Sequence, residues 1–188
     1  MQHDDILQLS RQLSGYDVCA EILALSVVEF SYTPESRIAL NINDSGGVLR
    51  DTGRGMRLTP DRGDTLSHAE RALTGHYPCV PSSTAIDVVL QELIWGTRGS
   101  LGPSLANFAC TSYRFTSMRD REIWSQSYQN GRPMGPAAML GATEETGTRV
   151  EFETHRPIDA GKVTRLVRTL CERIDGLSIS LQYAHANP

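Results

Sequence analysis

The segment Val18–Phe30 constrains the fold of this chain more than any other, because its sequence VCAEILALSVVEF is apolar around most of a helical circumference. A helix with this pattern has no face suited to water, and we expect it to be buried inside a core. No apolar run in the chain approaches the roughly 18 residues that a membrane span requires. The sequence therefore predicts a globular domain built around one buried helix, with no membrane association.

The length of the chain favours one domain. With 188 residues it can bury one substantial core but is short for two ordinary domains, so we predict a single unit over residues 1–188. The N-terminal sequence MQHDDILQLS is acidic where a secretion signal would be basic and then apolar. This pattern favours a cytoplasmic protein.

The cysteines and the net charge argue against several functions. Cys19, Cys79, Cys110 and Cys171 lie far apart and form no CxxC pair, so we expect reduced thiols, with no metal site and no disulfide framework. The formal net charge of −4 gives no overall attraction to phosphate backbones. We therefore expect no direct binding of nucleic acid by this chain.

The order of predicted elements indicates an α+β domain with helices on one face of a mostly antiparallel sheet. Apolar spacing typical of helices occurs at Asp5–Leu13, Val18–Phe30, Ser67–Leu73, Thr84–Trp95, Ser104–Cys110 and Ala160–Ile174. Strands are predicted at Arg37–Ile42, Val48–Asp51, Thr111–Met118, Glu122–Tyr128, Ala137–Leu140, Thr148–Thr154 and Leu177–Tyr183.

The stretch Arg57–Ser83 is rich in Pro, Gly, Ser and Thr and is predicted to be a long excursion from the domain. Loops of this length inside one compact domain are usually functional. Since it lacks periodic apolar residues to anchor it, we expect this lid-like segment to be the most mobile part of the chain and to close over a ligand. Its histidines, His68 and His76, are interpreted as solvated loop residues.

Three motifs follow one another along the chain. A strand hairpin ends in Asp51-Thr52-Gly53-Arg54-Gly55-Met56, a glycine-bearing run Gly96–Gly102 opens a helix, and a later strand begins Thr146-Gly147-Thr148-Arg149-Val150-Glu151-Phe152. The first string alone is more often a plain turn, but the order of the other elements reverses those odds. Together they resemble the ATP-binding domains of the gyrase, MutL, chaperone and histidine-kinase superfamily, and within it the B subunits of gyrase and topoisomerase IV.

This resemblance implies the Bergerat fold, a two-layer α/β sandwich, and an adenine pocket. In the family the Asp of the first motif accepts the adenine amino group, which would be Asp51 here, with Thr148 as a second partner through water. Gly53 and Gly55 would let the backbone approach a flat ring. The loop Gly96–Gly102 would place backbone N–H groups at a helix N-terminus, where phosphates can bind.

The mouth of such a pocket would be closed by arginines. Arg54 would pair with a carboxylate, for which Glu35 is the candidate, and Arg119 falls where the family's coumarin antibiotics bind. Thr148 as a residue that merely opens a strand, and Arg119 as an exposed hairpin charge beside Asp120, are equally compatible with the sequence. The resemblance assigns ligand binding to the following residues: Asp51, Gly53, Arg54, Gly55, Met56, Arg119, Thr148, Ser26 and Phe30.

The chain lacks the residue types of the family's catalytic motif. In the family the buried helix carries ExxDN, whose Glu activates water and whose Asn coordinates Mg²⁺, and the apolar frame places Ser26 and Phe30 at those two positions. A serine without an adjacent base is a poor general base, and phenylalanine cannot ligate a metal. Starting the motif at Glu29 puts Thr33 at the Asn position, and neither that frame nor one starting at Glu21 restores both functions.

The glycine-rich loop departs from the family pattern as well, at a position where Ser100 stands, and Pro103 follows the loop directly. Because the chain ends before a following transducer domain could begin, the resemblance suggests a free-standing domain that does not hydrolyse ATP.

Three functions follow from this interpretation. The first is a repurposed pocket that binds a small molecule, or ATP or ADP without Mg²⁺. In one variant it catalyses other chemistry, with Glu29, Asp51, Tyr32 or Arg119 as acid–base or orienting groups. The second is a partner-binding decoy or regulatory module of gyrase type. The third is a divergent ATPase with an unrecognised base. The sequence specifies neither the substrate nor the oligomeric state, and a homodimer stays open.

Overall fold

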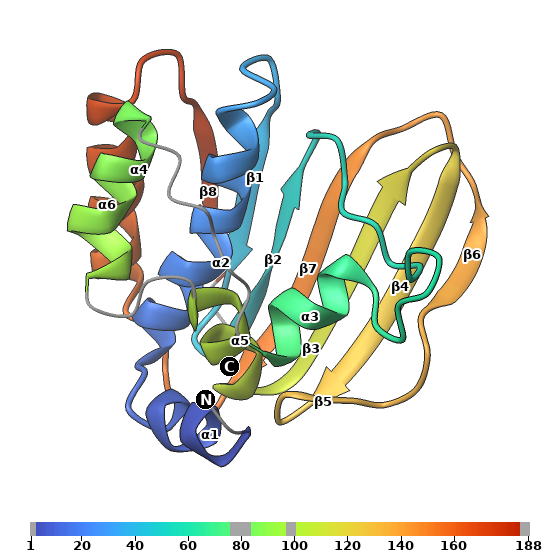
Figure 1. Cartoon of the computed structure of the whole chain (residues 1–188). Coiled ribbons are helices and arrows are strands. Elements are labelled where there is room, and N and C mark those ends of the chain that lie inside the picture. The colour runs from blue at the N-terminus through green and yellow to red at the C-terminus, as the bar shows by residue number, and fades with distance from the viewer. Residues whose placement is uncertain (1–2, 76–83, 97–100, 185–188) are drawn as a thin grey trace.

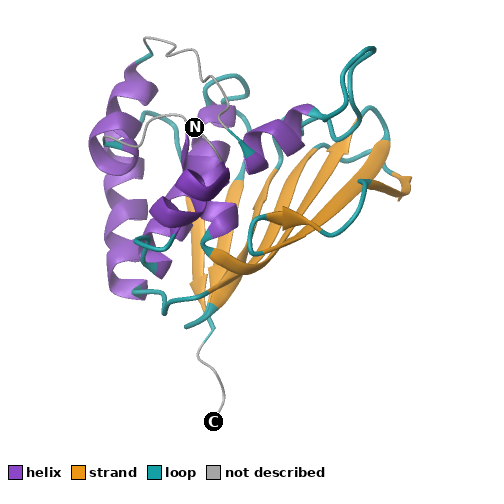
Figure 2. Cartoon of the chain, turned by 60° about the horizontal axis from the view of Figure 1, so that its bottom comes forward, coloured by secondary structure: helices purple, strands orange, loops and turns teal. Residues whose placement is uncertain are grey.

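The computed structural model describes residues 3–75, 84–96 and 101–184. They form a mixed α/β structure in which helices gather on one side of a large sheet (Figures 1 and 2). The sheet has eight strands, in the order β5-β4-β3-β7-β2-β1-β8, with β6 also paired to β4. Among the strand pairs, only β1 with β8 is parallel, within the described part of the chain. The predicted α+β fold class, with helices on one face of a mostly antiparallel sheet, is confirmed.

The buried central helix is α2 (Gly15–Phe30), as the apolar segment predicts. It begins before Val18 because Ser14 and Asp17 form a capping box, in which each side chain bonds the backbone N–H of the other. Val18, Ile22, Leu23 and Val27 are at most 1% exposed. The helix therefore fixes the position of everything that projects from it toward the sheet.

Four strands form the part of the sheet that matters for the site. The hairpin β1 (Ile38–Ile42) and β2 (Gly46–Asp51) is followed in space by β7 (Gly147–Thr154), then β3 (Cys110–Arg119). The register places Asp51 opposite Thr148, and Thr148 opposite Ser117. The motif that ends β2 and the motif that begins β7 therefore meet at one end of the sheet.

The remaining elements complete the two layers (Figure 1). Strand β4 (Glu122–Gln129) pairs with β3, and its outer edge carries β5 (Arg132–Pro133) and β6 (Ala138–Ala142). The remaining helices and the edge strand lie at α1 (His3–Ser10), α4 (Ala85–Leu90), α5 (Gly102–Phe108), α6 (Ala160–Arg173) and β8 (Ile179–Tyr183).

Several helix boundaries differ from the sequence prediction, and the first helix, expected over Asp5–Leu13, is α1 (His3–Ser10). The segment expected as one helix over Thr84–Trp95 is α4 followed by a π-helical turn, η1 (Gln91–Trp95). Helix α5 begins two residues before Ser104, with Pro103 in its first turn, where a missing N–H costs no helical hydrogen bond.

The excursion contains the short helix expected at Ser67–Leu73, and this helix anchors part of its length. Helix α3 (His68–Thr74), capped by Ser67, buries Ala69, Ala72 and Leu73. It packs on α5, whose Asn107 donates a side-chain hydrogen bond of 2.9 Å to the carbonyl of Leu73. The expectation that no apolar residues hold this segment is therefore wrong for α3. Residues 76–83, including His76, lie outside the described part.

No helix within the described ranges is long and apolar enough to cross a membrane. Those ranges also contain no cluster of three or more His, Cys, Asp or Glu side chains arranged to hold a metal ion.

Candidate functional site

The predicted site centres on the carboxylate of Asp51, at the end of β2. Asp51 is 2% exposed, and three elements supply donors to it. Its Oδ2 accepts hydrogen bonds from the hydroxyl of Ser26 on α2, at 2.7 Å, and from the hydroxyl of Thr148 on β7. Its Oδ1 accepts from the backbone N–H of Gly53 at 3.0 Å and of Thr148 at 3.2 Å. A buried carboxylate is thereby fully hydrogen-bonded, as burial of such a group requires.

The structure brings Asp51, Ser26 and Thr148 together, as the resemblance implied, but it gives them direct contacts. Thr148 touches Asp51 through both its hydroxyl and its backbone N–H. The Gly53 N–H bond to the Asp51 side chain also makes this residue a turn cap. Asp51 therefore has a structural role independent of any ligand.

The glycines of the motif are required by the protein's own packing. A Cβ on Gly53 would lie 2.3 Å from Cγ of Glu29, and one on Gly55 would lie 2.6 Å from the carbonyl oxygen of Met118. Gly55 also has a φ of +72°, which favours glycine. The described contacts thus explain why both positions are glycine. The reason expected from the sequence, close approach of the backbone to a flat ring, is not needed.

An ion pair forms the rim next to Asp51. Arg54 donates to the Glu29 carboxylate through its backbone N–H at 2.7 Å, Nε at 2.7 Å and an Nη at 2.9 Å. Its guanidinium also lies 4.4 Å from the ring centre of Tyr32, a cation–π arrangement. The predicted partner Glu35 is therefore wrong, because Glu29 in the last turn of α2 points over the Gly53 turn and reaches Arg54 first.

The environment of Glu29 makes it a weak base. Burial of its carboxyl would raise the pKa, but the hydrogen bonds and charge of Arg54, with a contribution from Arg119, outweigh burial and hold the pKa below its ordinary value. The other candidates for acid–base chemistry are similarly engaged, since Asp51 accepts four hydrogen bonds and Tyr32 lies under Arg54.

Arg119 combines the two roles that the sequence left open. One Nη donates a 3.0 Å hydrogen bond to the carbonyl of Gly55, and its Nε lies 3.4 Å from the carboxylate of Asp120. Asp120 and Arg121 both have positive φ, as in a two-residue type I′ hairpin between β3 and β4. Arg119 is thus a hairpin charge that also fastens the Gly55 turn, while Met56, the next residue, is half-buried against the core.

Glu21 is a second buried carboxylate that the sequence interpretation weighed but set aside. It is 1% exposed, and a Cβ on Gly102 would lie 2.0 Å from its Oε2, so the carboxylate rests against the start of α5. Glu21, Leu25 and Glu29 follow at a spacing of four and therefore lie along one face of α2. Glutamate is almost never fully buried, so a carboxyl side chain inside an apolar run was the signal available in the sequence.

Phe30 does not join this group. It is 4% exposed within the core, and its ring is the nearest group to a Cβ built on Gly176. Of the nine residues that the sequence assigned to ligand binding, Phe30 is the one that the structure places in the hydrophobic core. The expected phosphate loop falls largely on residues 97–100, which lie outside the described part.

The arrangement of a buried helix against an antiparallel sheet, with a carboxylate at the β2–β7 junction, defines a fold class. The fold is that of the gyrase B ATPase domain. The chain superposes on the 43K ATPase domain of Thermus thermophilus gyrase B in complex with an aminocoumarin, with a TM-score of 0.65 and 18% identity, over 88% of this chain and 42% of that one.

Sequence similarity is limited to a shorter segment. Over 52 residues the chain is 38% identical to the B subunit of DNA gyrase from Acinetobacter sp. (strain SEIP 12.81), which is 28% of this chain and 24% of that protein. No protein-family model matches the sequence. The chain thus spans less than half of either relative, and the similarity establishes the fold.

Proposed function

We propose that the chain binds a small molecule with a hydrogen-bond donor edge at Asp51, such as the adenine of ATP or ADP, without Mg²⁺-dependent hydrolysis. The hydrogen bonding of Asp51 is the observation that carries this proposal. Its Oδ1 is held by two backbone N–H groups, whereas its Oδ2 is held, within the described part of the chain, only by the hydroxyls of Ser26 and Thr148.

This asymmetry gives the two oxygens different uses. Backbone N–H groups are fixed donors, but a hydroxyl can rotate to accept a hydrogen bond instead of donating one. A ligand donor can therefore take the place of either hydroxyl at Oδ2 while Ser26 or Thr148 turns to accept from the ligand. The ligand must also offer an acceptor to the displaced O–H, because a buried donor left unpaired would cost about 1–3 kcal/mol.

The absence of turnover is inferred from the metal-ligand position. In the frame that starts at Ser26 the fifth residue is Phe30, and in the frame that starts at Glu21 it is Leu25. Mg²⁺ requires oxygen ligands, which neither side chain offers. A bound triphosphate would therefore lack the protein ligand that holds a bridging cation in place.

Calorimetric titration with ATP, ADP and an aminocoumarin, with and without Mg²⁺, tests the proposal. We expect saturable binding of at least one of these compounds that does not depend on Mg²⁺, and no phosphate release. Mg²⁺-dependent phosphate release at rates ordinary for gyrase domains would overturn it. Binding of none of them would instead favour a different ligand or the alternative of a partner-binding module of gyrase type.

Glu21 supports one alternative function, a divergent ATPase. Its carboxylate is buried against the start of α5, where a triphosphate would lie if the glycine-rich loop bound one. Under this alternative, Glu21→Gln would abolish phosphate release while retaining ATP binding. Phosphate release at the same background level from the unmodified protein and from Glu21→Gln would favour the proposal above.

A further inference from the structure

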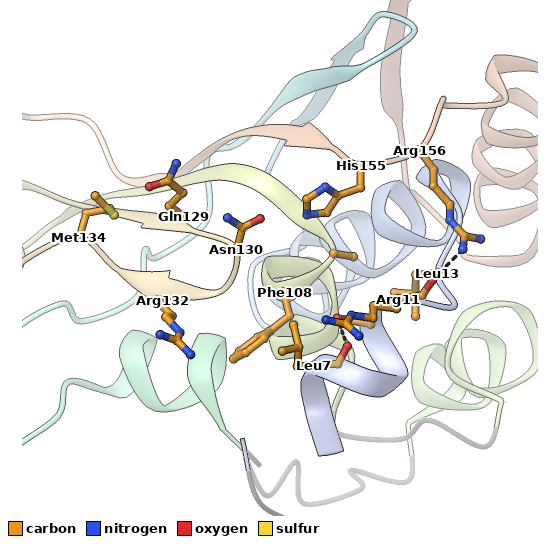
Figure 3. A pocket seen from close by; sticks show the side chains of 12 residues that line it. Leu7, Arg11, Leu13, Phe108, Gln129, Asn130, Arg132, Met134, His155 and Arg156 are labelled. Atoms are coloured by element: carbon orange, nitrogen blue, oxygen red, sulfur yellow. Dashed lines mark hydrogen bonds between the residues drawn. The ribbon is translucent and has the colours of Figure 1, made fainter. Parts of the chain in front are cut away.

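A cavity lies at the other end of the same strands, away from Asp51 (Figure 3). It has a volume of about 840 Å³ and is bounded by α1, the end of α5, the β4–β5 turn and the segment after β7. Strand β3 connects the two regions, because its Met118 end pairs with Gly147 near Asp51 and its Cys110 end pairs with Thr154 near this cavity. At about 3.3 Å per residue the two regions are about 25 Å apart. The cavity is therefore separate from the Asp51 site.

The charges around this cavity are of one sign. Its polar wall carries Arg11, Arg132, His155 and Arg156, and no Asp or Glu side chain contributes to the lining. Figure 3 shows these side chains coming from different elements and arranged around a common opening. Among the described residues, no carboxylate forms an ion pair with any of the four. This is notable in a chain whose net charge is −4, where acidic partners are in excess.

One wall of the cavity is held in place by a tight turn. Asn130 and Gly131, both with positive φ, form the turn between β4 and β5 that presents Arg132. A Cβ on Gly131 would lie 2.4 Å from the Phe108 ring, and the Asn107 side chain donates to the Gly131 carbonyl at 3.3 Å. The turn is thus clamped onto the end of α5.

The opposite wall is fixed as well. An Nη of Arg156 donates a 2.8 Å hydrogen bond to the carbonyl of Arg11, which joins the segment after β7 to the turn after α1. The carbonyls of Arg156 and Pro157 lie so close to Gly15 that a Cβ there would be within 2.7 Å of either oxygen. The backbone of both walls is therefore held in place by contacts within the protein.

We propose that this cavity binds a small organic anion, a phosphate or carboxylate attached to an apolar group. The guanidinium groups of Arg11 and Arg132 would hold the anionic group, with His155 as a further donor, since Arg presents a planar fork suited to phosphate and carboxylate oxygens. The apolar part would rest on Phe108 and Leu7, which form the floor. The volume falls within the range of about 300–1,000 Å³ typical of small-molecule sites.

Titration of the isotope-labelled protein with phenyl phosphate, inorganic phosphate and benzyl alcohol, followed by NMR, tests this inference. We expect phenyl phosphate to shift the resonances of residues around the cavity and to bind more tightly than either fragment alone. The double variant Arg11→Gln/Arg132→Gln should weaken phenyl phosphate binding by roughly tenfold or more. As a control for net charge, the double variant Arg165→Gln/Arg168→Gln, on the exposed side of α6, should leave the affinity unchanged.

The outcomes distinguish a built anion site from attraction by net charge and from a nucleic-acid surface. Equal weakening by the control variant would show attraction by net charge alone and overturn the proposal. Saturable, strongly salt-dependent binding of a single-stranded oligonucleotide at the same resonances, with none of phenyl phosphate, would also overturn it in favour of a nucleic-acid surface. Competition by ATP at the Asp51 resonances does not bear on this cavity, so the two sites can fail independently.

Discussion

The two ends of strands β3 and β7 handle charge in opposite ways. At the Asp51 end, each described charge has a protein partner: the Asp51 carboxylate accepts four hydrogen bonds, and Glu29 holds Arg54 through three. At the other end, Arg11 and Arg132 have no described carboxylate beside them. The first region can therefore persist without a ligand, whereas the second has cationic groups available for one.

Removing the central carboxylate should have the largest effect at the Asp51 end. In Asp51→Ala, the hydroxyl of Ser26 and the N–H groups of Gly53 and Thr148 lose a charged acceptor inside the fold. We expect a loss of about 2–4 kcal/mol in the free energy of unfolding, measured by urea denaturation. Ligand affinity per folded molecule should also fall roughly 10-fold to 100-fold.

Asp51→Asn serves as the matched variant, because it retains the shape and one carbonyl oxygen. If Asp51→Asn partly recovers the unfolding free energy while its ligand affinity stays reduced, the turn-capping role of Asp51 is distinct from its contact with the ligand. An unaltered dissociation constant in both variants would remove Asp51 from the site and leave it only the structural role.

The turn that presents Arg132 should be the most sensitive point of the basic cavity. Gly131→Ala would place a methyl group against the Phe108 ring at a φ of +78°. We expect a loss of about 1–3 kcal/mol from overpacking and backbone strain, measured by urea denaturation. Gly135→Ala is the control, since a Cβ there meets nothing within 4 Å, and a similar loss in both would argue against the clamp.

The Glu29–Arg54 pair should contribute less, because the Arg54 side chain is 52% exposed. A double-mutant cycle with Glu29→Gln and Arg54→Gln is expected to give a coupling energy of about 1 kcal/mol. This value lies between that of an exposed ion pair and that of a charge-assisted bidentate pair. A coupling near zero would show that solvent screens the pair completely.

The same pair has a defined pH dependence. The folded-state pKa of Glu29 lies below its ordinary value of 4.5, so the stabilisation is present above pH 4.5 and is lost as the pH falls through the folded value. Glu29→Gln should flatten this part of the stability profile in acid denaturation experiments.

The smallest effect, and of opposite sign, is expected for the unpaired arginines. Because Arg11 and Arg132 face no described carboxylate, Arg11→Gln should leave the unfolding free energy within about 0.5 kcal/mol or raise it slightly. Chemical denaturation without phosphate or carboxylate buffers is the suitable measurement. A loss above about 1 kcal/mol would mean that the guanidinium has a structural partner.

The success of the sequence prediction followed the range of the contacts. The buried helix was predictable from its local apolar pattern, and the proximity of Asp51 and Thr148 from the resemblance of their two motifs to a known family. The Arg54 partner was missed because the choice between Glu29 and Glu35 depends on where α2 ends and how it crosses β2. A sequence pattern specifies neither. Helix α3 was expected from the spacing at Ser67–Leu73, but its packing on α5 is a contact between segments distant in the sequence and was not predicted.

The basic cavity had no counterpart in the sequence interpretation. Arg11, Arg132 and His155 are separated by more than a hundred positions between the first and the last, and no motif links them. Only the pairing of β7 with β3 and the fold of α1 against α5 bring them together.

Helix α2 links the parts of the Asp51 region through its rotation about its own axis. Glu21 against Gly102, Ser26 against Asp51 and Glu29 against Arg54 all depend on the same angular phase. Deleting one residue between Glu21 and Ser26 would rotate the rest of the helix by about 100°. The three contacts could then no longer form at the same time. A substitution in this helix therefore alters one contact at a time, whereas an insertion or deletion disrupts several of them at once.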